Sequence, residues 1–364
     1  MKYFLILFLA MYAFAKKEYS LEHEISQLLL LGFEGATLED NPSIKRDIQE
    51  GLGAVILFDG FEDKSRGANN IKNPKQLKKL LSDMQALSEE PLLICIDQEG
   101  GQVVRLKENL GFDSLPSASF VGKKASASYS KSLYGNLADE LNGLGINCVF
   151  APVVDLAIEP KNPVIYQMQR SFSSDPKVVV EQAEIFMDAM RAKHLFSIIK
   201  HFPGHGSSLS DSHKGFVDVS KSWKSIELEP FKQLIEKRKV EMIMTAHIFN
   251  KHIDHKYPAT MSYKTNTKLL KEKLGFKGLM ISDGLQMHAI SKNFKLEEVV
   301  EKTLNSGVDI LLFANQLGFN SRDELVTVIK NLIKKKRLSE SSIRQKSEKI
   351  RQYKRRILSL KDNG

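Results

Sequence analysis

Cysteine is scarce in this sequence, which has only two, Cys95 and Cys148, in 364 residues. Both lie in apolar runs typical of strands, Leu92–Ile96 and Ile146–Phe150. Two alternatives are open: a disulfide formed in an oxidising compartment, or a pair of buried free thiols. We favour the free thiols, because cysteine often serves as a small core residue.

Several other signatures are missing, and each absence excludes a class of protein. No internal repeat is visible, which excludes a solenoid. No Gly-x-Gly-x-x-Gly follows a strand-like run, which argues against a dinucleotide-binding domain. Gly100-Gly101 lacks the Lys-Ser/Thr that follows in a phosphate-binding loop, so this turn is not one. No low-complexity linker divides the chain. With 42% hydrophobic and 27% charged residues, the composition is that of an ordinary globular protein with a large core.

Long apolar runs are also rare, and the one that stands apart is Tyr3–Phe14. Lys2 precedes it and Ala13–Ala15 fits a small-x-small cleavage site, so we expect residues 1–15 to be a secretory signal peptide. The alternative is an uncleaved anchor, but spanning a bilayer takes roughly 20 apolar residues. No cysteine follows Ala15 to carry a lipid. The expected location is therefore outside the cytoplasm, in the periplasm, without stable membrane insertion.

Positive charge exceeds negative charge, with a formal net charge of +9. Basic residues are dense in the last forty positions, for example at 334–337 and 354–356. Such runs can bind nucleic acid. This tail lacks interleaved aromatic residues, however, and a basic run is more often the solvated face of a helix. We expect no nucleic-acid partner, and the charge leaves the oligomeric state open.

Short apolar runs alternate with longer amphipathic stretches along the chain. Alternation of strand and helix predicts a parallel sheet, and continuous apolar strands predict burial on both faces. Eight such units favour closure into a single-domain α/β barrel of the (β/α)₈ TIM type over residues 16–364, with an open doubly wound sheet as the alternative. The expected strands are Leu28–Phe33, Ala54–Phe58, Leu92–Asp97, Cys148–Pro152, Ser197–Phe202, Met242–His247, Leu279–Asp283 and Ile310–Phe313. The clearest expected helices are Pro74–Ser88, Tyr129–Leu144, Pro176–Lys193, Ile226–Arg238 and Lys264–Leu274.

Polar residues follow these strands one after another. In a (β/α)₈ barrel the carboxyl ends of the strands build the active site, so these side chains should converge on one pocket. They are Asp97, Asp155, Lys200 with His201, His247 and Asp283.

The densest group of chemical residues lies in a glycine- and proline-bearing loop, Lys200–His213. Three histidines could indicate a metal site, but the spacing fits no usual zinc pattern and Lys200 would repel a cation. Proton transfer is the stronger hypothesis, since histidine titrates near neutrality. Asp211 lies two residues before His213 and could orient its ring in an extended segment.

Two strand ends carry carboxylates suited to carbohydrate chemistry. Asp283 ends its strand before Gly284, and a carboxylate there could attack the anomeric carbon of a sugar, although an aspartate in that place can also simply cap a helix. Asp97 begins a turn with two glycines that also contains Arg105, and both could bind sugar hydroxyls.

These motifs together resemble glycoside hydrolase family 3, and within it the bacterial β-N-acetylhexosaminidases. The most specific element is the loop Lys200-His201-Phe202-Pro203-Gly204-His205-Gly206, continued by Asp211-Ser212-His213. The resemblance runs from about Leu21 to Leu285, and the tail fits the closing helices. It implies the nucleophile Asp283, the general acid/base His213 paired with Asp211, and the N-acetylglucosamine ligands Asp97, Arg105, Arg170, Lys200 and His201.

The implied reaction is retaining hydrolysis of terminal β-linked N-acetylglucosamine from murein fragments, without metal or organic cofactor. Two departures bear on the pocket wall: Gly284 stands where this branch commonly has a second Asp, and residues 166–169 are atypical. The alternatives are a β-glucosidase or β-xylosidase of the same family, a wall-associated sugar-binding protein without catalysis, and a zinc-dependent hydrolase.

Overall fold

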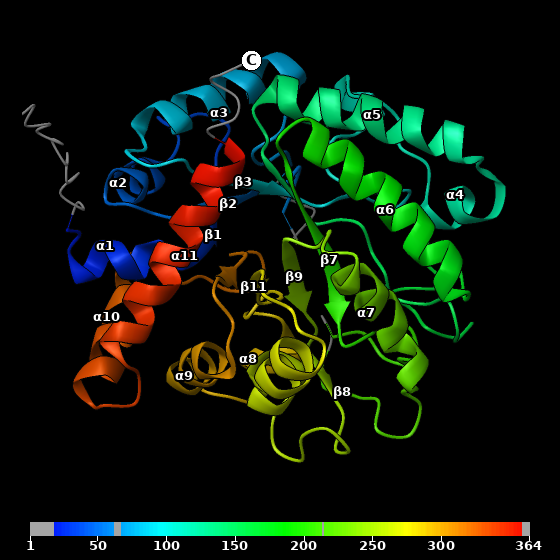
Figure 1. Ribbon diagram of the computed structural model, residues 1–364. Coiled ribbons are helices and arrows are strands. Elements are labelled where there is room, and N and C mark those ends of the chain that lie inside the picture. Colours follow the sequence, from blue (N-terminus) through cyan, green and yellow to red (C-terminus); the bar gives the residue numbers. More distant parts are fainter. Residues whose placement is uncertain (1–17, 62–66, 213–214, 359–364) are drawn as a thin grey trace, which may run out of the picture.

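The chain folds into a closed ring of parallel strands surrounded by helices (Figure 1). The computed structural model describes residues 18–61, 67–212 and 215–358. The expected signal segment 1–15 lies outside the described residues. Among the described residues, no helix is long and apolar enough to cross a bilayer.

Eight strands form the ring in the order β12-β1-β2-β3-β6-β7-β9-β11, all paired in parallel. A parallel bridge from Ile281 to Ile310 joins the two ends of this order and closes the barrel. The predicted (β/α)₈ barrel is confirmed, and every expected strand coincides with an observed one. The strands are β1 (Leu29–Gly32), β2 (Ala54–Leu57), β3 (Leu93–Ile96), β6 (Cys148–Val149), β7 (Phe196–Phe202), β9 (Met242–Thr245), β11 (Leu279–Ile281) and β12 (Leu311–Phe313).

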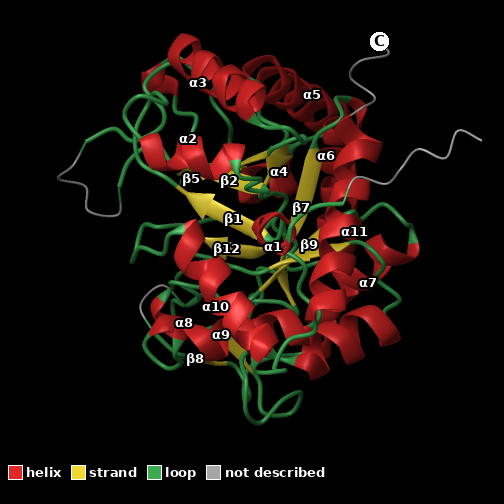
Figure 2. Cartoon of the chain, turned by 90° about the vertical axis from the view of Figure 1, so that its left-hand side faces the viewer, coloured by secondary structure: helices red, strands yellow, loops and turns green. Residues whose placement is uncertain are grey.

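Burial explains why these segments become strands. Every residue of the eight strands is buried, because the barrel interior covers one face and the helices cover the other (Figure 2). Cys95 and Cys148 are register partners on β3 and β6 and are free, buried thiols. The expectation of two core thiols is therefore confirmed.

Helices α3, α5 and α6 occupy stretches predicted to be helical. The predicted helix 226–238 instead divides into a 3-10 turn, η3, and the helix α7, and the predicted helix 264–274 is η5, wound as a π-helix. The helices are α1 (Leu21–Ser26), α2 (Pro42–Gln49), α3 (Pro74–Leu87), α4 (Ala118–Lys124), α5 (Ala127–Leu144), α6 (Pro176–Ala192), η3 (Ser225–Leu228), α7 (Glu229–Glu236), η5 (Lys264–Lys273), α8 (His288–Ser291), α9 (Leu296–Ser306), α10 (Arg322–Lys334) and α11 (Glu340–Leu358). Short elements in the loops are η2 (Glu108–Leu110), η4 (Ala259–Met261), β4 (Gln98–Gly100), β5 (Val103–Val104), β8 (Val217–Asp218) and β10 (Ile248–Phe249).

Three of these helices begin with the same local device, an Asn or Asp followed by proline. The side chains of Asn41, Asn73 and Asp175 each accept a hydrogen bond from a backbone N–H in the first turn. The proline that follows has no N–H to leave unpaired and has its φ already set for a helix. The sequence therefore fixes where α2, α3 and α6 start.

Helix α11 closes the end of the barrel at which the strands begin. Its Lys354 is buried and donates hydrogen bonds to the carbonyl oxygen of Gly53 (2.6 Å) and to Oε1 of Gln27 (2.9 Å), just before β2 and β1. Burial lowers the pKa of Lys354 to about 8. Arg351, one turn earlier, pairs with the buried Glu24 of α1 at 2.7 Å. The opposite end of the barrel remains for the functional site.

The close approach of β1 to the segment after β12 yields a test of the fold. A Cβ atom on Gly32 would overlap the backbone carbonyl of Ala314, so Gly32→Ala should lower the free energy of unfolding by about 1–3 kcal/mol, as overpacking does. Urea denaturation measures this. Gly135→Ala is the matched control, because nothing lies within 4 Å of a Cβ there in the middle of α5, and it should stabilise by about 0.5–1 kcal/mol. Equal stability of the two variants would contradict the proximity of β1 to Ala314.

Candidate active site

Polar side chains gather where the strands end. Asp59 follows β2, Asp97 follows β3, and Asp155 lies beyond β6. Lys200 and His201 lie near the carboxyl end of β7. Asp283 lies two residues after β11. This is the convergence that the sequence predicts for a closed barrel.

A pocket of 540 Å³ opens at this end of the barrel. Three of the expected site residues line it together: Asp97, Arg105 and Asp283. Its wall also includes Asp59 and Lys107, and apolar side chains from several loops. The apolar members are Ile56, Phe58, Phe61, Leu110, Met287, Leu312 and Leu317. A pocket of this size and mixed lining suits a small polar ligand with carbon-rich faces.

Behind one wall of the pocket, charges of opposite sign alternate from residue to residue. Because each buried charge has a partner of opposite sign, the row avoids the cost of isolated charges in a low dielectric. The row runs Lys107, Asp59, Arg105, Asp97, Lys200, Glu99, Arg170.

Lys200 is the central member of this row. Its Nζ lies 2.8 Å from Oδ1 of Asp97 and 2.6 Å from Oε1 of Glu99, and its side chain is only 3% exposed. Burial alone would raise the pKa of Asp97, but the charges of Lys200 and Arg105 outweigh burial and hold that pKa below its usual value. Asp97 is thus an ionised hydrogen-bond acceptor facing the pocket.

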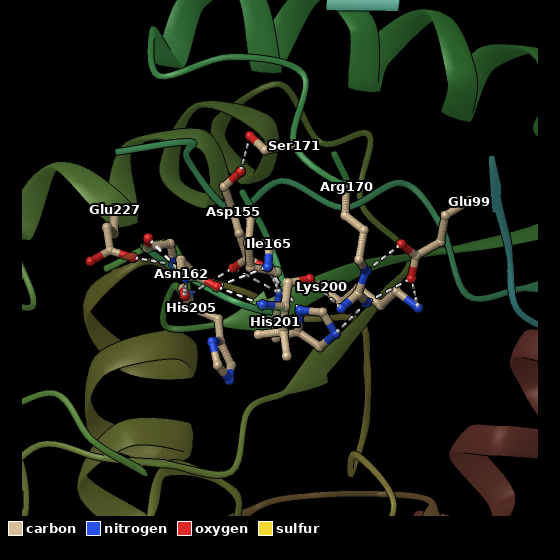
Figure 3. Close-up of polar contacts among 12 residues, drawn as sticks. Glu99, Asp155, Asn162, Ile165, Arg170, Ser171, Lys200, His201, His205 and Glu227 are labelled. Atoms are coloured by element: carbon tan, nitrogen blue, oxygen red, sulfur yellow. Dashed lines mark hydrogen bonds and ion pairs between the residues drawn. The ribbon is translucent and has the colours of Figure 1, made fainter. Parts of the chain in front are cut away.

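Arg170 and Glu99 form a bidentate ion pair in this row. Nε and Nη2 of Arg170 donate to Oε2 and Oε1 of Glu99 at 2.7 and 2.8 Å (Figure 3). Burial raises the pKa of Glu99, yet Arg170 and Lys200 overcome burial and bring it to about 2. Arg170, Lys200 and His201, expected as sugar ligands, are not among the pocket-lining residues and stand behind Asp97 and Arg105.

His201 is oriented by a carboxylate that the sequence left without a role, that of Asp155. Oδ2 of Asp155 lies 2.7 Å from Nδ1 of His201, and the backbone N–H of His201 points at the same carboxylate. Burial alone would raise the pKa of Asp155, but the interaction with His201 outweighs burial and holds the pKa below its usual value, so the carboxylate is ionised. Nε2 of His201 lies 3.4 Å from Nη2 of Arg170.

Asp283 is held from the neighbouring strand. Its Oδ1 accepts a hydrogen bond from the N–H of Gly284 at 2.7 Å. His247, just after β9, has Nε2 2.8 Å from the carbonyl oxygen of Gly284 and Nδ1 2.8 Å from Oγ1 of Thr260. Because a carbonyl only accepts, Nε2 of His247 carries the proton. The backbone that presents Asp283 to the pocket is thereby fixed.

The loop expected to carry the acid/base is partly described. Asp211 is half-buried, whereas His213 lies outside the described residues. The carbonyl oxygen of Ser212 accepts a hydrogen bond from the N–H of Ala289 (3.1 Å), so the loop meets α8 only a few residues beyond Asp283. His205, earlier in the loop, is buried, and burial followed by the charge of His201 lowers its pKa to about 4. His205 is therefore neutral at neutral pH.

The sequence did not single out four residues that the structure brings to this end of the barrel: Asp59, Glu99, Lys107 and Glu227. Glu99 could have been noticed, since it stands two residues after Asp97 in the same turn. Within the described ranges, no group of three or more His, Cys, Asp or Glu side chains is arranged to hold a metal ion.

Comparison with known proteins shows three relationships. Residues 20–353 match the family described as the glycosyl hydrolase family 3 N terminal domain. The chain is 34% identical over 344 residues to a beta-hexosaminidase of Haemophilus influenzae, covering 92% of this chain and 91% of that protein. It is 32% identical over 331 residues to beta-hexosaminidase A of Pseudoalteromonas piscicida, covering 84% of this chain but 54% of the relative.

A solved structure shares the fold. The glycoside hydrolase family 3 beta-N-acetylglucosaminidase from Paenibacillus superposes with a TM-score of 0.84 at 28% identity. The superposition covers 94% of this chain and 64% of the Paenibacillus chain. This chain thus spans nearly all of one relative and only part of two others.

The buried pairing of Glu99 predicts a pH dependence of stability. Its folded pKa, about 2, is below its usual 4.5, so the native state resists protonation and the ionised pair contributes stability above pH 4.5. That contribution should be lost as the pH falls from 4.5 towards 2. Urea unfolding across this range should show a smaller pH slope in Glu99→Gln than in wild type. Glu108→Gln, which removes a surface carboxylate, is the control, and identical slopes in all three proteins would contradict the prediction.

Proposed function

Because the chain belongs to glycosyl hydrolase family 3, we propose that it is a retaining β-N-acetylhexosaminidase that removes terminal β-linked N-acetylglucosamine. Family membership confirms the resemblance seen in the sequence and the class of enzyme, a glycosidase. The observation that carries the finer proposal is the pocket in which the Asp283 carboxylate shares a wall with the Asp97–Arg105 pair. The names of the Haemophilus and Paenibacillus relatives support the choice of sugar.

In the proposed reaction, Asp283 is the nucleophile. Its carboxylate attacks the anomeric carbon, the bond to the leaving oxygen breaks, and a glycosyl ester forms on the enzyme. Water then cleaves this ester and regenerates the carboxylate, with overall retention of configuration. The contact between His247 and Gly284 supports this role, because a nucleophile needs a fixed position to attack.

His213 is the proposed general acid/base, and Asp211 its partner. The imidazolium gives its proton to the leaving oxygen in the first step, and the neutral ring takes a proton from water in the second. The hydrogen bond from Ala289 to Ser212 supports this role, because it attaches the residue before His213 to the segment that follows Asp283. A neutral base is also not repelled by the Asp283 carboxylate.

Asp97 and Arg105 are the proposed ligands of the sugar. Asp97 is ionised and can accept hydrogen bonds from two neighbouring hydroxyls. Arg105 lies 3.6 Å from Asp97 and 3.8 Å from Asp59, beyond good hydrogen-bonding distance. The terminal guanidinium nitrogens of Arg105 are therefore left to donate to substrate. Lys200, Arg170 and His201 are the further proposed ligands of the sugar, and Lys200 also holds Asp97 in place at 2.8 Å.

We propose murein fragments as the source of the sugar and the periplasm as the place of action. Both rest on residues 1–15, which read as an export signal, and on the positive net charge, which suits acidic wall glycopeptides. A β-glucosidase of the same family remains the competing activity. Parallel assays with aryl β-glucoside and aryl β-N-acetylglucosaminide distinguish the two.

Removal of the nucleophile tests the reaction. Asp283→Ala should lower kcat/KM on p-nitrophenyl β-N-acetylglucosaminide at least about 10³-fold, because the proposed covalent step uses this carboxylate as its nucleophile. Release of p-nitrophenol measures this. Asp139→Ala, on the outer face of α5, is the matched control and should keep wild-type turnover. Substantial turnover by Asp283→Ala would remove this residue from its role.

The acid/base is tested by the leaving group. His213→Ala should slow hydrolysis of chitobiose, whose departing sugar is a poor leaving group, about 10²-fold or more. The first step of p-nitrophenyl substrate hydrolysis should slow far less. Single-turnover kinetics separate the first step from hydrolysis of the ester. Equal losses of first-step rate on both substrates would contradict an acid role for His213.

A further inference from the structure

The backbone at the base of the acid/base loop is held almost group by group. Three buried side chains from different parts of the chain hold residues 205–207 (Figure 3). Asp155 accepts from the N–H of residue 205 (2.8 Å); Asn162 donates to the carbonyls of residues 205 and 206 (2.8 and 3.0 Å); and Glu227 accepts from the N–H groups of residues 206 and 207 (2.7 and 3.3 Å).

Glu227 belongs to the same connection between β7 and α7 as the loop that it holds. It lies in η3, ahead of α7, and its relative exposure is 0%. A Cβ atom on Gly204 would lie 2.5 Å from the Cβ of Glu227, so the loop passes directly against this side chain. Only a residue without a side chain fits at position 204, opposite the buried glutamate.

The environment makes the charge of Glu227 costly. The pKa of Glu227 is raised to about 7, mainly by burial and also by the nearby Asp155 carboxylate, while hydrogen bonding by Ser207 partly opposes the rise. A buried carboxyl with a perturbed pKa marks a candidate functional residue. An apolar side chain of similar size would leave the N–H groups of residues 206 and 207 without this acceptor.

We propose that Glu227 is a positioning residue for the proton-transfer loop, setting the direction in which residues 208–212 leave the barrel. This inference rests on the proposed function, because it takes His213 as the acid/base. Two anchors define the loop: residues 205–207 on Glu227 and its partners, and Ser212 on Ala289. Between them Leu209 is 60% exposed.

Asp155 links this base to the sugar side of the pocket. The same carboxylate that accepts from residue 205 also orients His201, which contacts Arg170. Asp155 therefore fixes the base of the loop in position relative to the charge row. Withdrawal of Glu227 should tilt the loop and leave the row intact, so proton transfer should suffer more than sugar binding.

The test compares leaving groups in variants of Glu227. Glu227→Ala removes the acceptor for residues 206 and 207; kcat/KM should fall about tenfold more on chitobiose than on the p-nitrophenyl substrate, a fraction of the roughly 10²–10⁴-fold that general acids supply. Glu227→Gln keeps an acceptor and should bring this ratio back to within about threefold of wild type. Glu24→Gln, which weakens the buried pair with Arg351 at the far end of the barrel, controls for destabilisation and should leave the ratio unchanged.

Glu227→Asp keeps the test decisive if the alanine variant fails to fold. It retains the carboxylate but draws it back by one methylene, so it should show the selective loss on chitobiose that Glu227→Gln lacks. Equal losses on both substrates in the Ala and Asp variants would overturn the inference. If wild type cleaves neither substrate, the proposed function itself fails. If His213→Ala shows the leaving-group effect and the Glu227 variants do not, only the positioning role fails.

Discussion

The ammonium group of Lys200 is the constraint on which the active end of the barrel depends. It lies between Asp97 and Glu99, two carboxylates that leave the same strand two residues apart. Without cations beside them, these buried groups would repel each other, and ionisation of both would be unfavourable. Lys200 acts on both carboxylates, and with Arg170 beside Glu99 and Arg105 beside Asp97 it holds both pKa values below their usual range, so Asp97 faces the pocket as an acceptor.

Polarity and stability are divided between the two ends of the barrel. At the end where strands begin, α11 covers the opening through Lys354 and Arg351. At the end where strands finish, the loops carry the charge row, the pocket and Asp283. Asp59, Asp97 and Asp283 thus face a pocket, whereas Lys354 and Arg351 join α11 to the barrel and to α1. This division follows the usual separation of function and stability in (β/α)₈ barrels.

The sequence was sufficient for the barrel because each strand is buried on both faces and reads as a continuous apolar run. Helices were found where the amphipathic stretch was long, as in α5 and α6, whereas α1 and α2, with six and eight residues, are too short to repeat a stripe over several turns. Among the site residues, Asp97, Arg105 and Asp283 could be found because strand ends in a closed barrel share a rim. Glu227 could not, since its partners lie about 20 residues earlier in sequence and its own context resembles an ordinary helix start.

The contacts of Lys354 also bear on the order in which parts of the fold can form during synthesis. The last helix bonds to the backbone that leads into the first two strands, and β12 pairs with β1. During synthesis from the amino end, more than 300 residues must therefore be added after Gly53 before the end of the barrel at which the strands begin can be covered. Contacts of such long sequence separation form slowly. The edge of β1 therefore stays unpaired until β12 has been made, and the end of the barrel stays uncovered until Lys354 follows.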